Sequence, residues 1–241
     1  MRSAMILGSM LLLGACNFSA GAKETELSGQ KINRSFQVAG FDRVALGGPH
    51  NVVVTVGGAP SVRAEGDSAL IEQLEIKVED GELKIGNKDK NGFNWSSNRQ
   101  AVTIYVTTAS LRAASLAGSG NLKVDRAEGK SFEAAIGGSG NIELGSLKVE
   151  QASFAIGGSG NIKATGTAGS TESSIGGSGD LDLAGLDARR ATVSIAGSGN
   201  VNGRATETAE ISIVGSGDVT LAGGAKCEIN KVGSGEARCT G

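Results

Sequence analysis

The sequence is poor in aromatic residues, in histidine and in excess positive charge, and each shortage argues against a class of function. Aromatic side chains make up 3% of the 241 residues, so stacking platforms for nucleic-acid bases or sugars are not expected. Lys and Arg number 23 against 25 Asp and Glu, which gives a net charge of -2 and little attraction for nucleic acid. No group of His, Cys and carboxylates has the spacing of metal ligands. We therefore expect no nucleic-acid partner and no metal.

Proline is also scarce, whereas glycine is abundant, with 39 Gly against 2 Pro. There is no Gly-X-Y repeat, which excludes collagen, and 39% apolar residues are enough to build a core. Many glycines belong to a Gly-Ser-Gly tripeptide that occurs seven times, at intervals of 20, 20, 19, 20, 18 and 18 residues. We expect these tripeptides to form the corners of a repeating structure, and their glycines are Gly118, Gly120, Gly138, Gly140, Gly158, Gly160, Gly177, Gly179, Gly197, Gly199, Gly215, Gly217, Gly233 and Gly235.

The residues around each corner alternate in polarity. In most repeats apolar residues stand two and four positions before the first glycine and four and six positions after it, and polar residues separate the last two. This period of two is typical of strands with one buried face, and a fixed interval near 20 residues is the signature of a solenoid. The sequence predicts an all-β fold, a right-handed parallel β-helix with coils of about 20 residues over 111–241. The alternative is an antiparallel meander in which Gly-Ser-Gly forms hairpin turns.

Residues 34–110 are less regular but still rich in strand patterns. A short helix is expected in the stretch that begins at Asp67, and Gly47–Asn51 (GGPHN) resembles a worn corner, in which His50 is interpreted as a turn residue. The candidate strands are 43–46, 51–56, 62–65, 75–78, 82–85 and 102–107.

The N-terminus has the pattern of an export signal. Arg2 precedes an apolar run that is too short to span a bilayer, and Leu13-Gly14-Ala15-Cys16 resembles the lipobox of bacterial lipoproteins. The resemblance implies a signal peptide over 1–15, a lipid on Cys16 and a membrane anchored through that lipid. Asn17, in place of Asp, favours the outer membrane by the same resemblance. Residues 16–33 are polar and aperiodic, and we expect them to form a flexible tether.

The two remaining cysteines, Cys227 and Cys239, are predicted to form a disulfide, because an exported compartment permits one. They stand six residues before and six after Gly233, at positions that are buried in the other repeats. In this last repeat Lys231 replaces the apolar residue found two positions before the other corners. The pattern indicates a cap that closes the exposed end of the solenoid.

The sequence offers little that points to catalysis or cofactor binding. Each Gly-Ser-Gly is followed by a strand pattern rather than a helix, which argues against nucleotide binding, and the order of residues does not fit calcium-binding repeats. No base stands at a constant distance from the corner serines. We expect no cofactor and no enzymatic activity.

Two features of the expected surface are candidates for binding. Small residues stand three positions before most corners, as at Ser115 and Ala135, and would give a flat face that another surface could approach closely. Phe93 and Trp95 lie in a polar loop over 87–100 and could form a binding tip. Each has a purely structural alternative, since small residues suit a tight corner and the aromatic pair could cover the open end of the solenoid.

The repeated Gly-Ser-Gly-Asn/Asp after an apolar strand, preceded by a region such as FDRVALGGPHNVVVTVGGAP, resembles the bacterial GIN domain. This family is catalogued as the head domain of putative autotransporter adhesins and is otherwise a domain of unknown function. The resemblance covers residues 34–241 and implies a β-helical exported protein with no catalytic residues to carry over. It favours a lipid-anchored adhesion or binding module of the cell envelope with a protein or glycan partner. The alternatives are a periplasm-facing scaffold that contacts other envelope proteins and, least favoured, a polysaccharide hydrolase.

Overall fold

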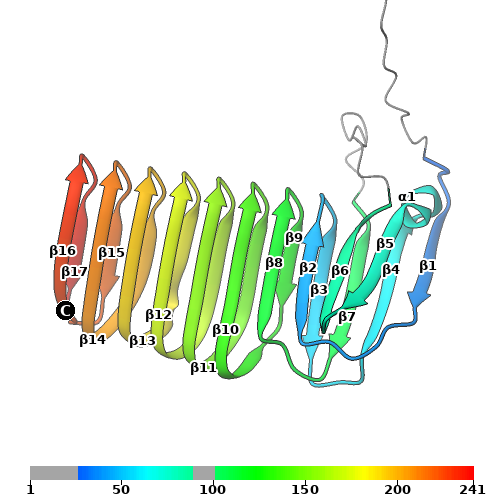
Figure 1. Cartoon of the computed structure of the whole chain (residues 1–241), viewed down its shortest axis with the longest axis horizontal. Coiled ribbons are helices and arrows are strands. Elements are labelled where there is room, and N and C mark those ends of the chain that lie inside the picture. The colour runs from blue at the N-terminus through cyan, green and yellow to red at the C-terminus, as the bar shows by residue number, and fades with distance from the viewer. Residues whose placement is uncertain (1–26, 89–100) are drawn as a thin grey trace, which may run out of the picture.

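The computed structural model describes residues 27–88 and 101–241, and most of them belong to one sheet of 17 strands that coils into a solenoid (Figure 1). In the repeat region each coil climbs one face, turns at a corner and descends the other. The strands of this region are β8 (Ala113–Gly118), β9 (Asn121–Val124), β10 (Ala127–Gly138), β11 (Asn141–Gly158), β12 (Asn161–Gly177), β13 (Asp180–Gly197), β14 (Val201–Gly215), β15 (Val219–Ala222), β16 (Lys226–Gly233) and β17 (Ala237–Thr240).

Neighbouring coils pair in parallel and in register, one repeat per coil. Ile136 pairs with Leu116 on one side and with Ile156 on the other. The expected β-solenoid is therefore confirmed, and the antiparallel meander is wrong for these strands. Register is specified because a slip of one residue would turn the apolar side chains outward.

The N-terminal part continues the same solenoid, but in an order that differs from the order of the chain. β2 (Arg43–Gly47) pairs in parallel with β8, and β3 (Asn51–Val56) pairs in parallel with β9. On their other sides β2 and β3 pair in parallel with β6 (Glu82–Asn87) and β7 (Thr103–Thr108). The coil made by β2 and β3 therefore lies between later strands and the seven repeats.

Antiparallel strands and one short helix close this end. β4 (Ser61–Asp67) pairs with β7, β5 (Leu74–Glu79) pairs with β6, and β1 (Lys31–Phe36) pairs with β4. The expected helix is α1 (Ser68–Glu72), whose cap is the Asp67 carboxylate, 2.9 Å from the backbone nitrogen of Ala69. A hydrogen-bonded carboxylate is a favoured N-cap because it satisfies a backbone N–H that the helix leaves open.

The folded part begins before residue 34, where the tether was expected to end. Lys31–Asn33 already belong to β1, and the backbone nitrogens of Ser28 and Gly29 donate to Asp67. These bonds, with that from Ala69, lower the pKa of Asp67 although its burial acts to raise it. The polar pattern of this stretch gave no sign of the edge strand, since β1 is mostly exposed. The rest of the predicted tether lies outside the described residues.

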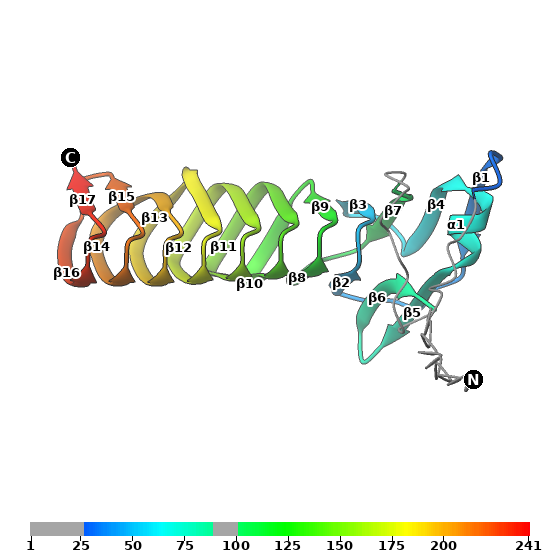
Figure 2. The ribbon, with the colours of Figure 1, turned by 90° about the horizontal axis from the view of Figure 1, so that it is seen from above.

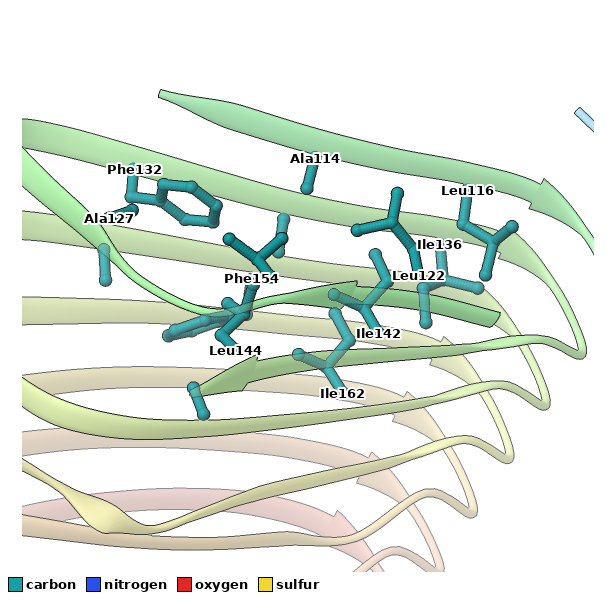
Figure 3. Close-up of a cluster of buried hydrophobic side chains, with 14 of the residues drawn as sticks. Ala114, Leu116, Leu122, Ala127, Phe132, Ile136, Ile142, Leu144, Phe154 and Ile162 are labelled. Atoms are coloured by element: carbon teal, nitrogen blue, oxygen red, sulfur yellow. The ribbon is translucent and has the colours of Figure 1, made fainter. Parts of the chain in front are cut away.

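The core is a narrow column of apolar side chains between the two faces (Figure 3). Ile136 and Ile142 point inward from either side of one corner, and the rings of Phe132 and Phe154 fill the wider part of the column. Each of these four side chains is at most 2% exposed. Burying such a side chain is worth about 1.5–3 kcal/mol, so each added coil stabilises its neighbours through this column.

Candidate binding surfaces

Stacked backbone holds the corners together. The backbone nitrogens of Ser139 and Gly140 both donate to the carbonyl oxygen of Gly118 in the preceding coil, at 2.9 and 3.0 Å. Gly138 has φ +148°, a region that favours glycine, and a Cβ on it would lie 2.4 Å from the same oxygen. Gly140 lacks the positive φ, but its Cβ would lie 2.2 Å from the oxygen of Gly120. The first glycine is thus needed for its backbone angle and for close approach, and the second for close approach.

An Asn and Asp ladder runs along the solenoid just after the corners. The Nδ2 atoms of Asn121, Asn141 and Asn161 each donate to the Oδ1 of the preceding rung, at 2.9–3.0 Å. Asp180, Asn200 and Asp218 continue the ladder with bonds to side-chain oxygens of the coil before. These bonds join equivalent residues of successive coils.

The outward surface of the strands after the corners, which we call the ladder face, is occupied by contacts between coils. The Nζ of Lys123 lies 3.0 Å from Glu143 Oε1, and the Nζ of Lys163 lies 3.1 Å from Asp182 Oδ2. Near the N-terminal end the guanidinium of Arg63 lies 4.5 Å from the ring centroid of Tyr105. These side chains form exposed pairs on a polar face.

Gly47–Asn51 is an eighth corner, as its resemblance to the others predicts. Gly48 has φ +115°, and the Gly120 nitrogen donates to its carbonyl oxygen at 3.0 Å. His50 stands where the repeats have their second glycine.

His50, interpreted from the sequence as a turn residue, is a buried residue of this corner. It is 1% exposed, and its Nε2 lies 3.1 Å from Asn87 Oδ1 at the end of β6. Burial lowers the pKa of His50, while the hydrogen bond to Asn87 acts in the opposite direction. The pattern around Gly48 indicates the corner, but the burial of the ring depends on the chain order of β6 and β7, which sequence patterns do not give.

The strands before the corners present a second outward surface, which we call the smooth face. Its central row contains Ala45, Ser115, Ala135, Ala155, Ser174, Ser194, Ser212 and Asn230, which are neighbours in the sheet. Its row beside the corners contains Gly47, Ala117, Gly137, Gly157, Gly176, Ala196, Val214 and Val232. Only the last two members are large and apolar, and Val214 and Val232 are 57% and 71% exposed.

The hairpin of β5 and β6 projects beyond the line of strands at the N-terminal end of the smooth face (Figure 2). Its two-residue turn is Asp80-Gly81, with φ 51° and 74°, a combination that fits the right-handed twist of a hairpin. Lys77 and Lys84 each place Nζ 2.8 Å from a carboxylate oxygen of Glu79. Hydrogen bonds from Lys77 and then Lys84 lower the pKa of Glu79 to about 2.

A groove of about 560 Å³ lies where this hairpin meets the smooth face. Gly47, Ala117 and Gly137 are among the residues of its floor, and Lys77 and Lys84 line its charged side. The hollow exists because the floor residues have small side chains or none, and the hairpin forms one wall. The row of small residues three positions before the corners, which includes Ser115 and Ala135, was visible in the sequence. The wall was not, because it depends on β5 and β6 lying beside β2.

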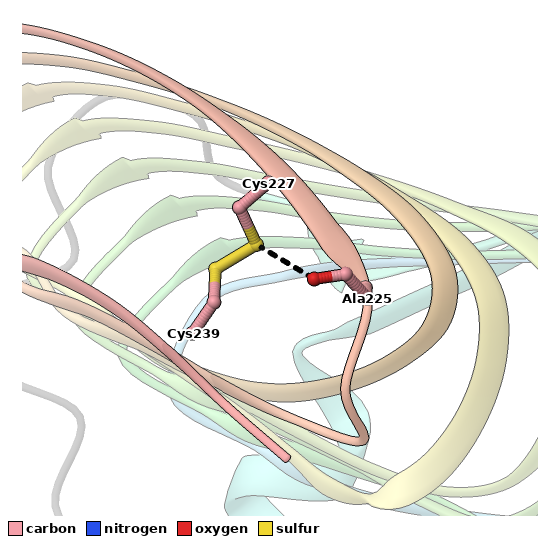
Figure 4. Close-up of a disulfide and its surroundings, with 3 residues drawn as sticks. All are labelled: Ala225, Cys227 and Cys239. Atoms are coloured by element: carbon pink, nitrogen blue, oxygen red, sulfur yellow. Dashed lines mark hydrogen bonds between the residues drawn. A yellow bond between two sulfur atoms is a disulfide. The ribbon is translucent and has the colours of Figure 1, made fainter.

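The predicted disulfide between Cys227 and Cys239 is present and crosses the last coil from β16 to β17 (Figure 4). The two Cα atoms are 6.6 Å apart. Cys227 Sγ lies 3.6 Å from the carbonyl oxygen of Ala225, a packing contact, since a disulfide sulfur has no proton to donate. Lys231 turns its ammonium to the carbonyl oxygen of Gly235 at 3.1 Å. Both features close the end of the core, as the sequence indicated.

The predicted lipid attachment site and the predicted aromatic tip cannot be placed, because Cys16, Phe93 and Trp95 lie outside the described residues. Within the described part of the chain no cluster of three or more His, Cys, Asp or Glu residues could hold a metal ion. No helix among residues 27–88 and 101–241 is long and apolar enough to cross a membrane.

Comparison with known families identifies the fold. The family model for the putative auto-transporter adhesin, head GIN domain, matches residues 40–225. The chain belongs to this family. GIN-domain membership agrees with the resemblance seen in the corners, and the family's description points to a protein of the cell envelope or surface. No protein with a curated description matches the sequence.

Solved structures share the architecture of this GIN domain at low sequence identity. A putative adhesin from Bacteroides fragilis is 22% identical, with a TM-score of 0.83, covering 88% of this chain and 98% of that one. A putative lipid binding protein from Parabacteroides distasonis is 23% identical, with a TM-score of 0.72, covering 91% and 100%. A putative adhesin from the same organism is 20% identical, with a TM-score of 0.69 and the same coverage. These likenesses establish a shared fold.

Proposed function

We propose that this protein is a non-enzymatic, lipid-anchored binding module that mediates adhesion at the bacterial cell surface. The observation that carries the proposal is the GIN solenoid itself, in which two broad sheet faces lie on opposite sides of the rod and are both turned outward. The adhesin descriptions of the family and of the Bacteroides fragilis and Parabacteroides distasonis proteins support the same reading.

The lipobox-like sequence that ends at Cys16 supports the proposed attachment to the membrane. The signal peptide would be removed, and a lipid on Cys16 would hold the rod to the outer membrane. Metabolic labelling with a palmitate analogue tests this step, with Cys16→Ala as the matched control. Label on the wild-type chain and none on the variant is expected; equal labelling of both would exclude lipid attachment at Cys16.

Adhesion requires the domain to lie on the outer side of the outer membrane, whereas the alternative, a periplasmic scaffold, requires it to lie on the inner side. Protease added to intact cells, followed by immunoblotting for the domain, separates the two. A periplasmic control protein must survive, and a lysed sample must show that the folded solenoid can be cut. Loss of the domain signal in intact cells is expected, and it would justify binding assays on host, matrix and neighbouring-cell surfaces. Protection until the outer membrane is opened would contradict adhesion and favour the scaffold.

A further inference from the structure

We propose that the smooth face is the contact surface of a two-fold homodimer in which two solenoids lie antiparallel, with Val214 and Val232 of each copy seated in the groove beside the β5–β6 hairpin of the other. The proposal concerns self-association and does not depend on adhesion. It begins from an uneven distribution of bulk on one face. The large apolar side chains that are exposed on the smooth face, Val214 and Val232, are at its C-terminal end, and the hollow is at its N-terminal end.

The size of the face suits a stable dimer. Eight adjacent strands at about 4.8 Å and about six residues of 3.3 Å each give a footprint of about 38 by 20 Å, or roughly 760 Å². A standard interface buries about 800 Å² on each partner. The row of small side chains allows the two sheets to approach closely, and Figure 1 shows the strands of this region stacked side by side along the axis.

A two-fold axis parallel to the strands, passing between β11 and β12, puts each bulky residue opposite a small one. Under this symmetry the first strand of the face, β2, meets the last, β16, and β8 meets β14. Val232 then faces the partner's Gly47, and Val214 faces the partner's Ala117. Both of these small residues line the groove. The projecting hairpin passes beyond the end of the partner, so it guides the contact without obstructing it.

Charge selects the same register. The outer row of the smooth face contains Arg43, Ala113, Glu133, Ser153, Glu172, Thr192, Glu210 and Glu228, in spatial order. In the proposed register Glu228 faces the partner's Arg43, and none of the glutamates of this row faces another. A shift by one coil in one direction sets Glu133 opposite the partner's Glu210, and a shift in the other sets it opposite the partner's Glu172. Like charges placed directly opposite each other are destabilising, so the two neighbouring registers are disfavoured.

Cysteine crosslinking of the full chain tests the register. The pair Ala45→Cys and Asn230→Cys lies in the central row of the first and last strands, and should give a disulfide-linked dimer on a non-reducing gel. The matched control is the pair Val53→Cys and Arg238→Cys, which are as many strands apart on the ladder face. Each single-cysteine variant, tested alone, shows how much dimer forms through Cys16. Dimer from the first pair alone supports the proposal. No dimer, or equal dimer from both pairs, overturns it.

A charge placed at the proposed axis tests the same surface without crosslinking. Ser174 is exposed in the single chain and would face the partner's Ala155. Light scattering of the full chain in detergent should give the mass of two chains for the wild type and of one chain for Ser174→Arg, with Asn202→Arg on the ladder face remaining dimeric. A cooperative urea unfolding transition in both variants would show that both are folded. A wild-type monomer, or a Ser174→Arg variant that stays dimeric, would contradict the proposal.

Discussion

The two ends of the solenoid are closed in different ways. At the N-terminal end, three antiparallel strands and α1 cover the core, and Leu70, Ile71 and Leu74 are each at most 4% exposed. At the C-terminal end a single coil remains, with Cys227 and Cys239 joined across it and Ile229 41% exposed. The N-terminal end is closed by burial of apolar side chains, which takes many residues. The C-terminal end is closed by the disulfide and by the charged Lys231. Between them the coils are nearly interchangeable, so we expect unfolding to begin at an end of the stack.

The largest decrease in the free energy of unfolding is expected from a substitution at a contact between neighbouring coils. Gly138→Ala puts a Cβ 2.4 Å from the Gly118 oxygen at a positive φ, and should reduce the free energy of unfolding by about 3 kcal/mol or more, or prevent folding. Gly137→Ala is the matched control, because no atom lies within 4 Å of its Cβ. Urea unfolding monitored by circular dichroism measures both. Equal effects of the two substitutions would mean that the corner stack does not limit stability.

The apolar closure at the N-terminal end is tested by Ile71→Ala. Ile71 is 1% exposed, so its loss leaves a cavity and should reduce the free energy of unfolding by about 2–5 kcal/mol. Glu72→Ala, on the exposed side of the same helix, should have little effect. A small effect of Ile71→Ala in the same urea experiment would show that α1 is dispensable for closing this end.

The covalent closure at the other end is tested by the double substitution Cys227→Ser and Cys239→Ser. The disulfide spans 12 residues, and its loss should cost about 2–4 kcal/mol. Reductant should lower the unfolding midpoint of the wild type to that of the variant and leave the variant unchanged. If the variant unfolds at the same urea concentration as the oxidised wild type, the disulfide does not stabilise the end.

The smallest effect is a pH dependence at the eighth corner. Burial lowers the pKa of His50 from its ordinary 6.5, so the unfolded chain binds a proton more readily than the folded one. The stability that neutral His50 gives is complete above about pH 6.5 and is lost as the pH falls toward the lowered pKa. His50→Gln should flatten this part of the stability curve, measured by urea unfolding between pH 8 and 5. Identical slopes for both proteins would exclude His50 as the cause.

The regular part of the fold could be predicted from the sequence because every coil has the same local sequence pattern. The period, the glycine pair and the alternation around Ile136 or Ile156 fix strand, corner and buried face within a single repeat. The disulfide was predictable because Cys227 and Cys239 are the two cysteines left after Cys16. The boundary at residue 34 was misplaced because β1 buries little apolar surface.

The groove and the burial of His50 could not be read from local pattern. Both depend on β6 and β7 lying beside β2 and β3, so that strands late in the chain occupy an earlier place in the stack. The Asp80-Gly81 turn gave a local signal for the hairpin, but nothing local showed that the hairpin would project from the smooth face. Non-local strand order is decided by packing of the whole column, which a residue-by-residue pattern does not contain.

Hydrogen exchange measured along the chain tests most directly the claim that the stack of coils unfolds from its ends. In the oxidised wild type the amides of β10–β13 should exchange slowest. In the variant with Cys227→Ser and Cys239→Ser, protection should fall first in β16 and β17, then in β14 and β15, and remain longest in β8 and β10. A uniform loss of protection over all coils would contradict the account, because it would mean that the solenoid unfolds as one unit, whatever closes its end.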